Sequence, residues 1–100
     1  MNYEIQSQDG GVLVLMKGEL TFNDHPTIKK MLTELSSGSH KSWTFDLSAL
    51  DSIDSAGIGM MLIAKDEGEK VNARLSLRAP SGNVRKVLEL TKIGDMIAIQ

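Results

Sequence analysis

Apolar residues along the chain follow two different spacings, and short polar segments separate the stretches that carry each spacing. Five stretches show alternating or continuous apolar positions, which is typical of strands: residues 3–8, 12–16, 42–47, 71–79 and 96–99. Three stretches show apolar positions three and four apart, which is typical of amphipathic helices: the one after Asn23-Asp24, the one after Asp54, and the one from Pro80-Ser81-Gly82 to Leu90. The pattern predicts eight elements in the order β-β-α-β-α-β-α-β.

Burial differs between the predicted strands. The run Val12–Met16 is continuously apolar, so we expect a central strand covered on both faces. Residues 42–47 alternate, which predicts one buried face, and residues 48–54 are expected to form a turn. Residues 71–79 also alternate, with a polar side expected to face solvent.

The alternation of strands and helices after the opening hairpin predicts right-handed crossovers and mostly parallel pairing. The polar strand faces indicate that helices cover one face of the sheet more fully than the other. We therefore expect an α/β fold with a mixed sheet and helices packed mainly on one face. A chain of 100 residues is expected to form a single domain over residues 1–100.

Composition and charge exclude several classes of protein. Eleven basic and thirteen acidic residues give a net charge of −2, which argues against a nucleic-acid-binding protein. The chain has no cysteine, so disulfide scaffolds and cysteine-based zinc sites are excluded. No apolar run approaches the about 20 residues that a membrane helix needs, and residues 1–4 carry no signal pattern. We expect a cytoplasmic protein with no membrane insertion.

Signatures of enzymes and metal sites are also missing. Gly57-Ile58-Gly59 begins like a dinucleotide-binding motif, but Leu62 stands at the third glycine position. His25 and His40 have no second ligand at a metal-binding spacing, and we interpret both as surface residues. The sequence predicts no enzymatic activity, no cofactor and no metal.

The stretch from Asp54 to Gly59 is unusual because a helix start carries two glycines in its first turn. Each glycine costs about 1 kcal/mol relative to alanine inside a helix. One interpretation is structural: Ser55 or Asp54 caps the helix, and the glycines permit close packing. The other is functional: small residues keep the helix tip open so that another protein reaches the Ser55 hydroxyl. The two interpretations are compatible.

The residues Asp46-Leu47-Ser48 followed by Ile53-Asp54-Ser55-Ala56-Gly57-Ile58-Gly59 resemble the signature of the STAS domain family, the anti-sigma factor antagonists. The resemblance extends over essentially the whole chain, and Gly18-Glu19-Leu20 fits the end of the family's second strand. It implies the family's mixed sheet and order of elements.

The resemblance also implies a partner switch. The unphosphorylated form would bind an anti-sigma factor that is a GHKL-type serine kinase, which frees a sigma factor or another regulated partner. Phosphorylation at Ser55 would reverse this binding, and a PP2C-type phosphatase would restore it. The residues expected at the partner surface are those around Ser55 and at the start of the first helix: Thr21, Asn23, Asp24, Asp54, Ala56, Gly57, Ile58, Gly59 and Met60.

Two positions depart from the family pattern. Thr21 stands where relatives often have an aspartate, so acidic support near the site would come from Asp24. Ala56 replaces a second hydroxyl residue, which leaves Ser55 as the acceptor within the motif, with Ser48 and Ser52 as alternatives outside it. A non-switching scaffold subunit of a transport or signalling complex is the alternative function that the same resemblance implies.

Overall fold

Five strands form one mixed sheet in the order β1-β2-β3-β4-β5 in the computed structural model, which describes residues 1–100. β1 pairs antiparallel with β2 through a hairpin, and the pairs β2–β3, β3–β4 and β4–β5 are parallel, as the crossovers predicted. The strand bounds are β1 Asn2–Gln8, β2 Gly11–Leu20, β3 Ser42–Ile53, β4 Arg74–Arg78 and β5 Ala98–Ile99.

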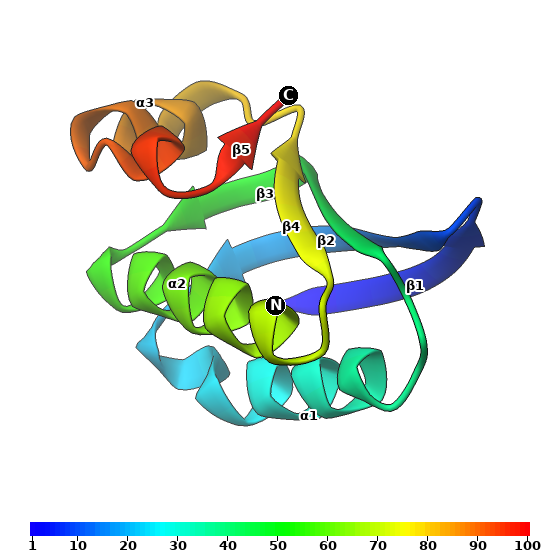
Figure 1. Ribbon diagram of the computed structural model, residues 1–100. Coiled ribbons are helices and arrows are strands. Elements are labelled where there is room, and N and C mark those ends of the chain that lie inside the picture. Colours follow the sequence, from blue (N-terminus) through cyan, green and yellow to red (C-terminus); the bar gives the residue numbers. More distant parts are fainter.

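Three α-helices connect the parallel strands, namely α1 His25–Ser36, α2 Ser55–Lys70 and α3 Gly82–Leu90. Helices α1 and α2 lie together on one side of the sheet. Helix α3 lies beside β5, at the opposite end of the molecule from α1 (Figure 1). Two 3₁₀ turns, η1 Phe22–Asp24 and η2 Ile93–Asp95, precede α1 and β5. The predicted mixed α/β fold with helices mainly on one face is confirmed.

The core lies between the sheet and the helices. Alternate residues of β2 and β3 point into it, because successive side chains of a strand face opposite sides. The apolar residues that recur at helical spacing in α1 are all buried, namely Ile28, Met31, Leu32 and Leu35. The fully buried large side chains are Met16, Leu20, Met31, Leu35, Trp43, Phe45, Leu47, Met60, Met61, Leu77, Leu88 and Ile97.

The prediction that residues 48–54 form a turn is wrong. β3 continues to Ile53 and pairs with β2 as far as Leu20. Two register shifts between these strands interrupt the regular alternation, so that the buried residues Leu47, Leu50 and Ile53 are three positions apart. Irregular strand pairing of this kind removes the period of two on which strand prediction depends. The end of the strand therefore places Asp54 directly at the start of α2.

Other predicted strand features also need correction. β4 begins only at Arg74, because Val71 and Asn72 close the end of α2, and Asn72 has a positive φ of 59°. β5 is limited to two residues, since the chain before it turns through η2. Leu13 and Leu15 of β2 are only half-buried, whereas the continuous apolar run predicted a strand covered on both faces.

The strand β3 is buried on both faces at its centre, whereas the alternation predicted one buried face. Thr44 is 8% exposed and Asp46 is 6% exposed. Asp46 accepts hydrogen bonds from the Ser48 hydroxyl at 2.6 Å and the Ser48 N–H at 2.9 Å, and its carboxylate lies 3.4 Å from the Arg78 guanidinium. Burial on its own raises the pKa of Asp46. The hydrogen bonds from Ser48 and the charge of Arg78 together outweigh this effect, so the pKa lies below its usual value.

Asp46→Asn is expected to reduce the loss of stability in acid. A carboxyl with a lowered folded-state pKa stabilises the fold above its ordinary pKa of about 3.9, and this contribution disappears as the pH falls through the folded value. The free energy of unfolding, measured by urea denaturation between about pH 6 and pH 2, should fall less steeply in Asp46→Asn. Asp66→Asn, at an exposed position on α2, is the control. An unchanged slope in Asp46→Asn would contradict the expectation.

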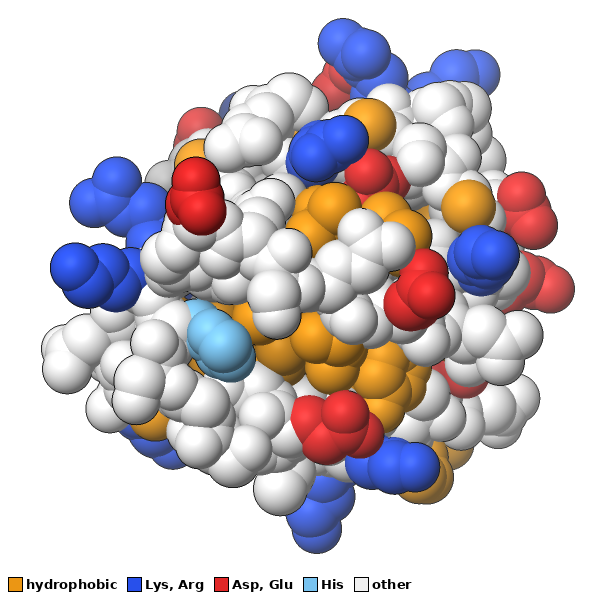
Figure 2. All heavy atoms as spheres, turned by 90° about the vertical axis from the view of Figure 1, so that its right-hand side faces the viewer, with side chains coloured by type: hydrophobic (Ala, Val, Ile, Leu, Met, Phe, Trp, Pro, Cys, Tyr) orange, Lys and Arg blue, Asp and Glu red, His pale blue; other side chains and the backbone are white.

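Charged side chains of both signs are interspersed on the face that Figure 2 shows, around apolar side chains that reach the surface in its middle. Neither sign forms a large patch on this face. None of the helices is both long enough and apolar enough to cross a bilayer.

Candidate functional site

The start of α2 is fixed by the carboxylate of Asp54, which is the N-cap of the helix. Its Oδ1 accepts the N–H of Gly57 at 2.8 Å, and its Oδ2 accepts the N–H of Phe22 at 3.2 Å. The backbone N–H of Asp54 donates to the carbonyl of Leu20 at 3.2 Å. One residue therefore joins the end of β3, the end of β2 and the first turns of both η1 and α2.

Ser55 is the first residue of α2, and its side chain is exposed. The Ser55 hydroxyl forms no hydrogen bond within the chain, whereas Asp54 performs the capping that the sequence left open between the two residues. The positive end of the α2 dipole also lies at this position, and it favours a negative group there.

The alternative hydroxyls outside the motif are engaged with nearby carboxylates. Ser48 donates to Asp46 at 2.6 Å, and Ser52 donates to Glu19 at 3.0 Å. Both lie on β3 rather than at the helix tip. Of the three candidate hydroxyls, that of Ser55 is the one without a partner.

The two glycines of the first turn have different roles. An added Cβ at Gly57 would lie 2.6 Å from the Leu20 carbonyl oxygen and 2.6 Å from Cγ1 of Ile53, so Gly57 is required for close packing of α2. A Cβ at Gly59 would have no neighbour within 4 Å. Gly57 is buried, and the expectation that it keeps the tip accessible is wrong; Gly59 leaves open space at the surface.

Met60 does not lie at the surface, contrary to the sequence prediction. It is 1% exposed, because α2 packs against both the sheet and α1, so that its buried side is wider than a single stripe. Ala56 and Ile58 are half-buried. The residue of α2 that is exposed instead is Ile63, with 47% of its surface accessible.

The segment before α1 presents Thr21 and Asn23 next to Asp24. Asp24 is 9% exposed and accepts the N–H of Thr21 at 2.8 Å and the N-terminal ammonium of Met1 at 2.9 Å. Burial raises the pKa of Asp24, but these hydrogen bonds outweigh it and hold the pKa below its usual value. The Asp24 carboxylate is therefore paired with groups of its own chain at the start of α1. Thr21 is half-buried, and Asn23 is exposed.

Phe22 is a surface residue that the sequence pattern does not single out. Its ring is 69% exposed and packs edge-on against His25, with ring centroids 5.5 Å apart. The hydrogen bond from its N–H to Asp54 holds Phe22 beside the start of α2. A single aromatic residue between strand and helix carries no periodic signal, so only the tertiary contact reveals it.

Replacement of Asp54 by alanine is expected to lower the free energy of unfolding by about 1–2 kcal/mol, since it removes an N-cap. Ser55→Ala is expected to change it by less than about 0.5 kcal/mol, because an exposed side chain without contacts contributes little. Urea denaturation of the two variants checks this difference. A large loss in Ser55→Ala would show that the serine has a structural role.

No three side chains of histidine, aspartate or glutamate lie together in a way that could hold a metal ion. His25 contacts Phe22 and has no carboxylate partner. An exposed hydroxyl, a capping carboxylate and an exposed aromatic ring therefore lie together at the start of α2.

Several known proteins share this architecture. The family model for the STAS domain matches residues 2–100. The chain is similar to the Bacillus anti-sigma factor antagonist SpoIIAA in its unphosphorylated form, with a TM-score of 0.75, 24% identity, and coverage of 99% of this chain and 88% of that chain. For TM1081 from Thermotoga maritima, the TM-score is 0.86 at 22% identity, with coverage of 97% and 84%. A sulfate transporter family protein from Wolinella succinogenes also matches, with a TM-score of 0.72, 16% identity, and coverage of 86% and 70%.

Proposed function

Because this chain belongs to the STAS domain family, we propose that it acts as an anti-sigma factor antagonist controlled by phosphorylation at Ser55. The unphosphorylated chain binds an anti-sigma factor that is also a GHKL-type serine kinase. This binding releases a sigma factor or another regulated partner. A PP2C-type phosphatase reverses the modification.

The observation that carries this proposal is the free, exposed hydroxyl of Ser55 at the first position of α2. In the transfer, the Ser55 oxygen attacks the γ-phosphorus of ATP, the bond to ADP breaks, and a base of the kinase takes the hydroxyl proton. Gly59 leaves room for the approach, because nothing lies within 4 Å of the position where its Cβ would be. The likeness to SpoIIAA, which is known in both unphosphorylated and phosphorylated forms, supports the same interpretation.

The proposed binding surface consists of exposed or half-buried residues on both sides of Asp54. It comprises Thr21, Phe22, Asn23, Asp54, Ser55, Ala56, Ile58 and Gly59. Aromatic side chains contribute strongly to interfaces because they bury a large apolar area at a low entropy cost. Phe22 is therefore the proposed apolar anchor, and it requires an apolar pocket on the kinase. Gly57, Met60 and Asp24 support this surface from within the fold.

The test uses the GHKL-type serine kinases encoded in the same genome as the chain, each purified and incubated with the chain and ATP. Intact mass should show one added phosphate on the wild type with the cognate kinase and none on Ser55→Ala. Ser52→Ala, which removes a neighbouring hydroxyl, is the matched control and should still be modified. Full labelling of Ser55→Ala would overturn the assignment.

A second function is supported by the similarity to a sulfate transporter family protein, which is solved with this fold. In that case the chain is a non-switching scaffold subunit of a transport or signalling complex. None of the kinases would then bind or modify it. Co-purification from its own cells should instead recover a transporter component, equally well with wild type and Ser55→Ala.

A further inference from the structure

The face of the sheet directed away from α1 and α2 carries a recessed polar surface that the proposed switch does not use. The register places Thr44 beside Ser76 and Ser42 beside Arg74 on neighbouring strands. Directly paired residues lie on the same face of a sheet. Thr44 and Ser76 are 8% and 7% exposed, and their hydroxyl oxygens are 3.4 Å apart. Two hydroxyl side chains therefore form a floor below the level of the surrounding surface.

Longer side chains border this floor, and together they form an open cavity of about 430 Å³. Gln8 reaches over from β1 and donates to the Thr44 hydroxyl at 3.4 Å. Arg74 and Arg78, four positions apart on β4, point to the same side as Ser76 between them. The lining is almost entirely polar and consists of Gln8, Ser42, Thr44, Arg74, Ser76, Arg78, Ala98 and Gln100.

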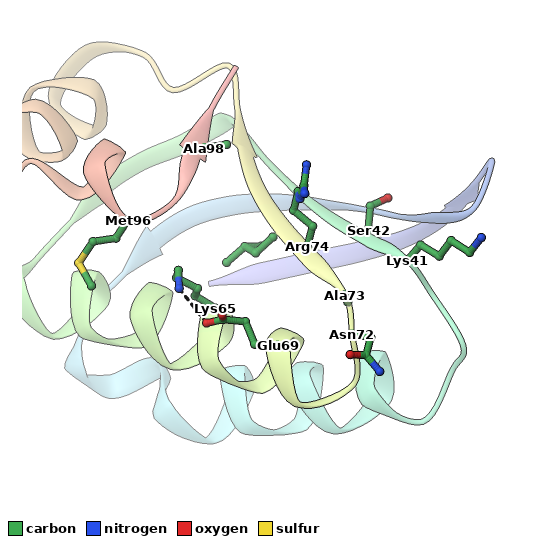
Figure 3. Close-up of a pocket in the computed structure, with 10 residues that line it drawn as sticks. Lys41, Ser42, Lys65, Glu69, Asn72, Ala73, Arg74, Met96 and Ala98 are labelled. Atoms are coloured by element: carbon green, nitrogen blue, oxygen red, sulfur yellow. Dashed lines mark hydrogen bonds and ion pairs between the residues drawn. The ribbon is translucent and has the colours of Figure 1, made fainter.

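The two arginines differ in whether a carboxylate neutralises their charge. Arg78 is paired with Asp46 at 3.4 Å, whereas Arg74 forms no ion pair. Figure 3 shows the adjoining cavity at the β4 edge, where the Arg74 and Ser42 side chains point away from the Lys65–Glu69 ion pair on α2. The positive charge of Arg74 is therefore directed, together with the Ser42 hydroxyl, toward the polar face of the sheet.

We propose that this cavity binds a small phosphate-bearing molecule. A guanidinium presents N–H groups in a fork that matches phosphate oxygens, and charge-assisted hydrogen bonds of this kind are the strong ones. The hydroxyls of Ser42, Thr44 and Ser76 each retain bonding capacity beyond the contacts described, since a hydroxyl has one donor and two lone pairs. The phosphate lies at Arg74, away from Asp46, and the hydroxyl and amide groups of the floor bind the polar body of the ligand.

The short length of β5 keeps this site open. β5 pairs with β4 only at Ser76 and Leu77, so that no strand covers the edge beside Arg74. None of the eight lining residues belongs to the proposed kinase-binding surface. The proposal therefore stands or falls independently of phosphorylation at Ser55.

The test is an NMR titration of the ¹⁵N-labelled chain with inorganic phosphate, ribose 5-phosphate, ribose and chloride at constant ionic strength. Saturable amide shifts around residues 42–44 and 74–78 are expected with both phosphates and absent with ribose and chloride. A tighter fit for ribose 5-phosphate would identify an organic phosphate as the ligand, and a tighter fit for inorganic phosphate would identify the free anion.

Variants then locate the binding. Arg74→Ala is expected to weaken binding of the preferred phosphate at least tenfold, and the isosteric Thr44→Val is expected to weaken it several-fold. Arg85→Ala removes an exposed arginine from α3 and should leave the affinity unchanged. The proposal is overturned if chloride produces the same shifts, if neither phosphate saturates at millimolar concentration, or if binding survives Arg74→Ala in a folded variant.

Discussion

Phosphorylation of Ser55 is expected to weaken binding to the cognate kinase at least a hundredfold, while the melting temperature of the chain changes by only a few degrees. The phosphate adds about −1.5 to −2 charges beside the Asp54 carboxylate. For such charges about 6 Å apart, the repulsion is roughly 1.4 kcal/mol in water but about 5 kcal/mol at an effective dielectric of 20. The free chain keeps the phosphate in water, whereas the complex desolvates it.

The local structure explains why the fold tolerates the modification. The Ser55 side chain is exposed and has no internal contacts to lose, and the α2 N-terminus stabilises a negative group by about 0.3–1 kcal/mol. Calorimetry of the phosphorylated and unphosphorylated chains against the kinase measures the affinities. Differential scanning calorimetry measures the melting temperatures.

A neutral substitution distinguishes the effect of charge at position 55 from the effect of side-chain volume. Ser55→Gln adds volume without charge and is expected to bind the kinase more tightly than Ser55→Glu, because the repulsion is absent. If phosphorylation leaves binding unchanged, the switch does not operate through this surface. If it unfolds the chain, Ser55 has a structural role that its lack of contacts does not suggest.

Gly57→Ala is expected to destabilise the fold by about 1–3 kcal/mol, the usual cost of overpacking a close contact. The new methyl group would lie 2.6 Å from the Leu20 carbonyl oxygen, which is backbone and cannot rotate away. The same carbonyl accepts the N–H of Asp54, so movement of Leu20 would also disturb the junction of β3 and α2. In a domain of this size, a loss of 1 kcal/mol lowers the melting temperature by about 4–8 °C.

The matched control lies two residues along the same helix. Gly59→Ala makes the identical chemical change where the new methyl group would meet no atom within 4 Å beyond the neighbouring backbone of its own helix, so the higher helix propensity of alanine should stabilise the fold by up to about 1 kcal/mol. Chemical denaturation should thus give shifts of opposite sign for the two variants. Destabilisation of similar size in both would mean that the close contact of Gly57 is not what requires glycine.

Regular periodicity predicted the parts of the fold where one face is buried and the pairing is uninterrupted. The stripe of α1, from Ile28 to Leu35, is an example, since all its members are buried as expected. The second half of β3 was not predicted as a strand, because its register shifts place the buried residues three positions apart along the chain. The burial of Met60 was not predicted, because α2 contacts both the sheet and α1, and a helix buried on two sides has no single apolar stripe.

The candidate site was predictable to the extent that its chemistry is local. Asp54, Ser55 and Gly57 are neighbours in the chain, and helix-capping rules identify the first two as possible caps. Sequence could not distinguish which of them is the cap, because this depends on side-chain direction. Phe22 lies 33 positions before Ser55, and its place at the site depends on a hydrogen bond between distant segments.

The carboxylate of Asp54 accepts one backbone N–H on each side of the proposed surface, and these two hydrogen bonds affect the entropic cost of association. Phe22 and Ser55 are held at a fixed separation before any partner arrives, because both their segments are joined to the same residue. Ordering a loop during binding costs about 0.5–1.5 kcal/mol for each immobilised side chain. A surface ordered in advance avoids most of this loss, so under the proposed function the partner would dock as a rigid body, and a local change in charge alone would govern its release.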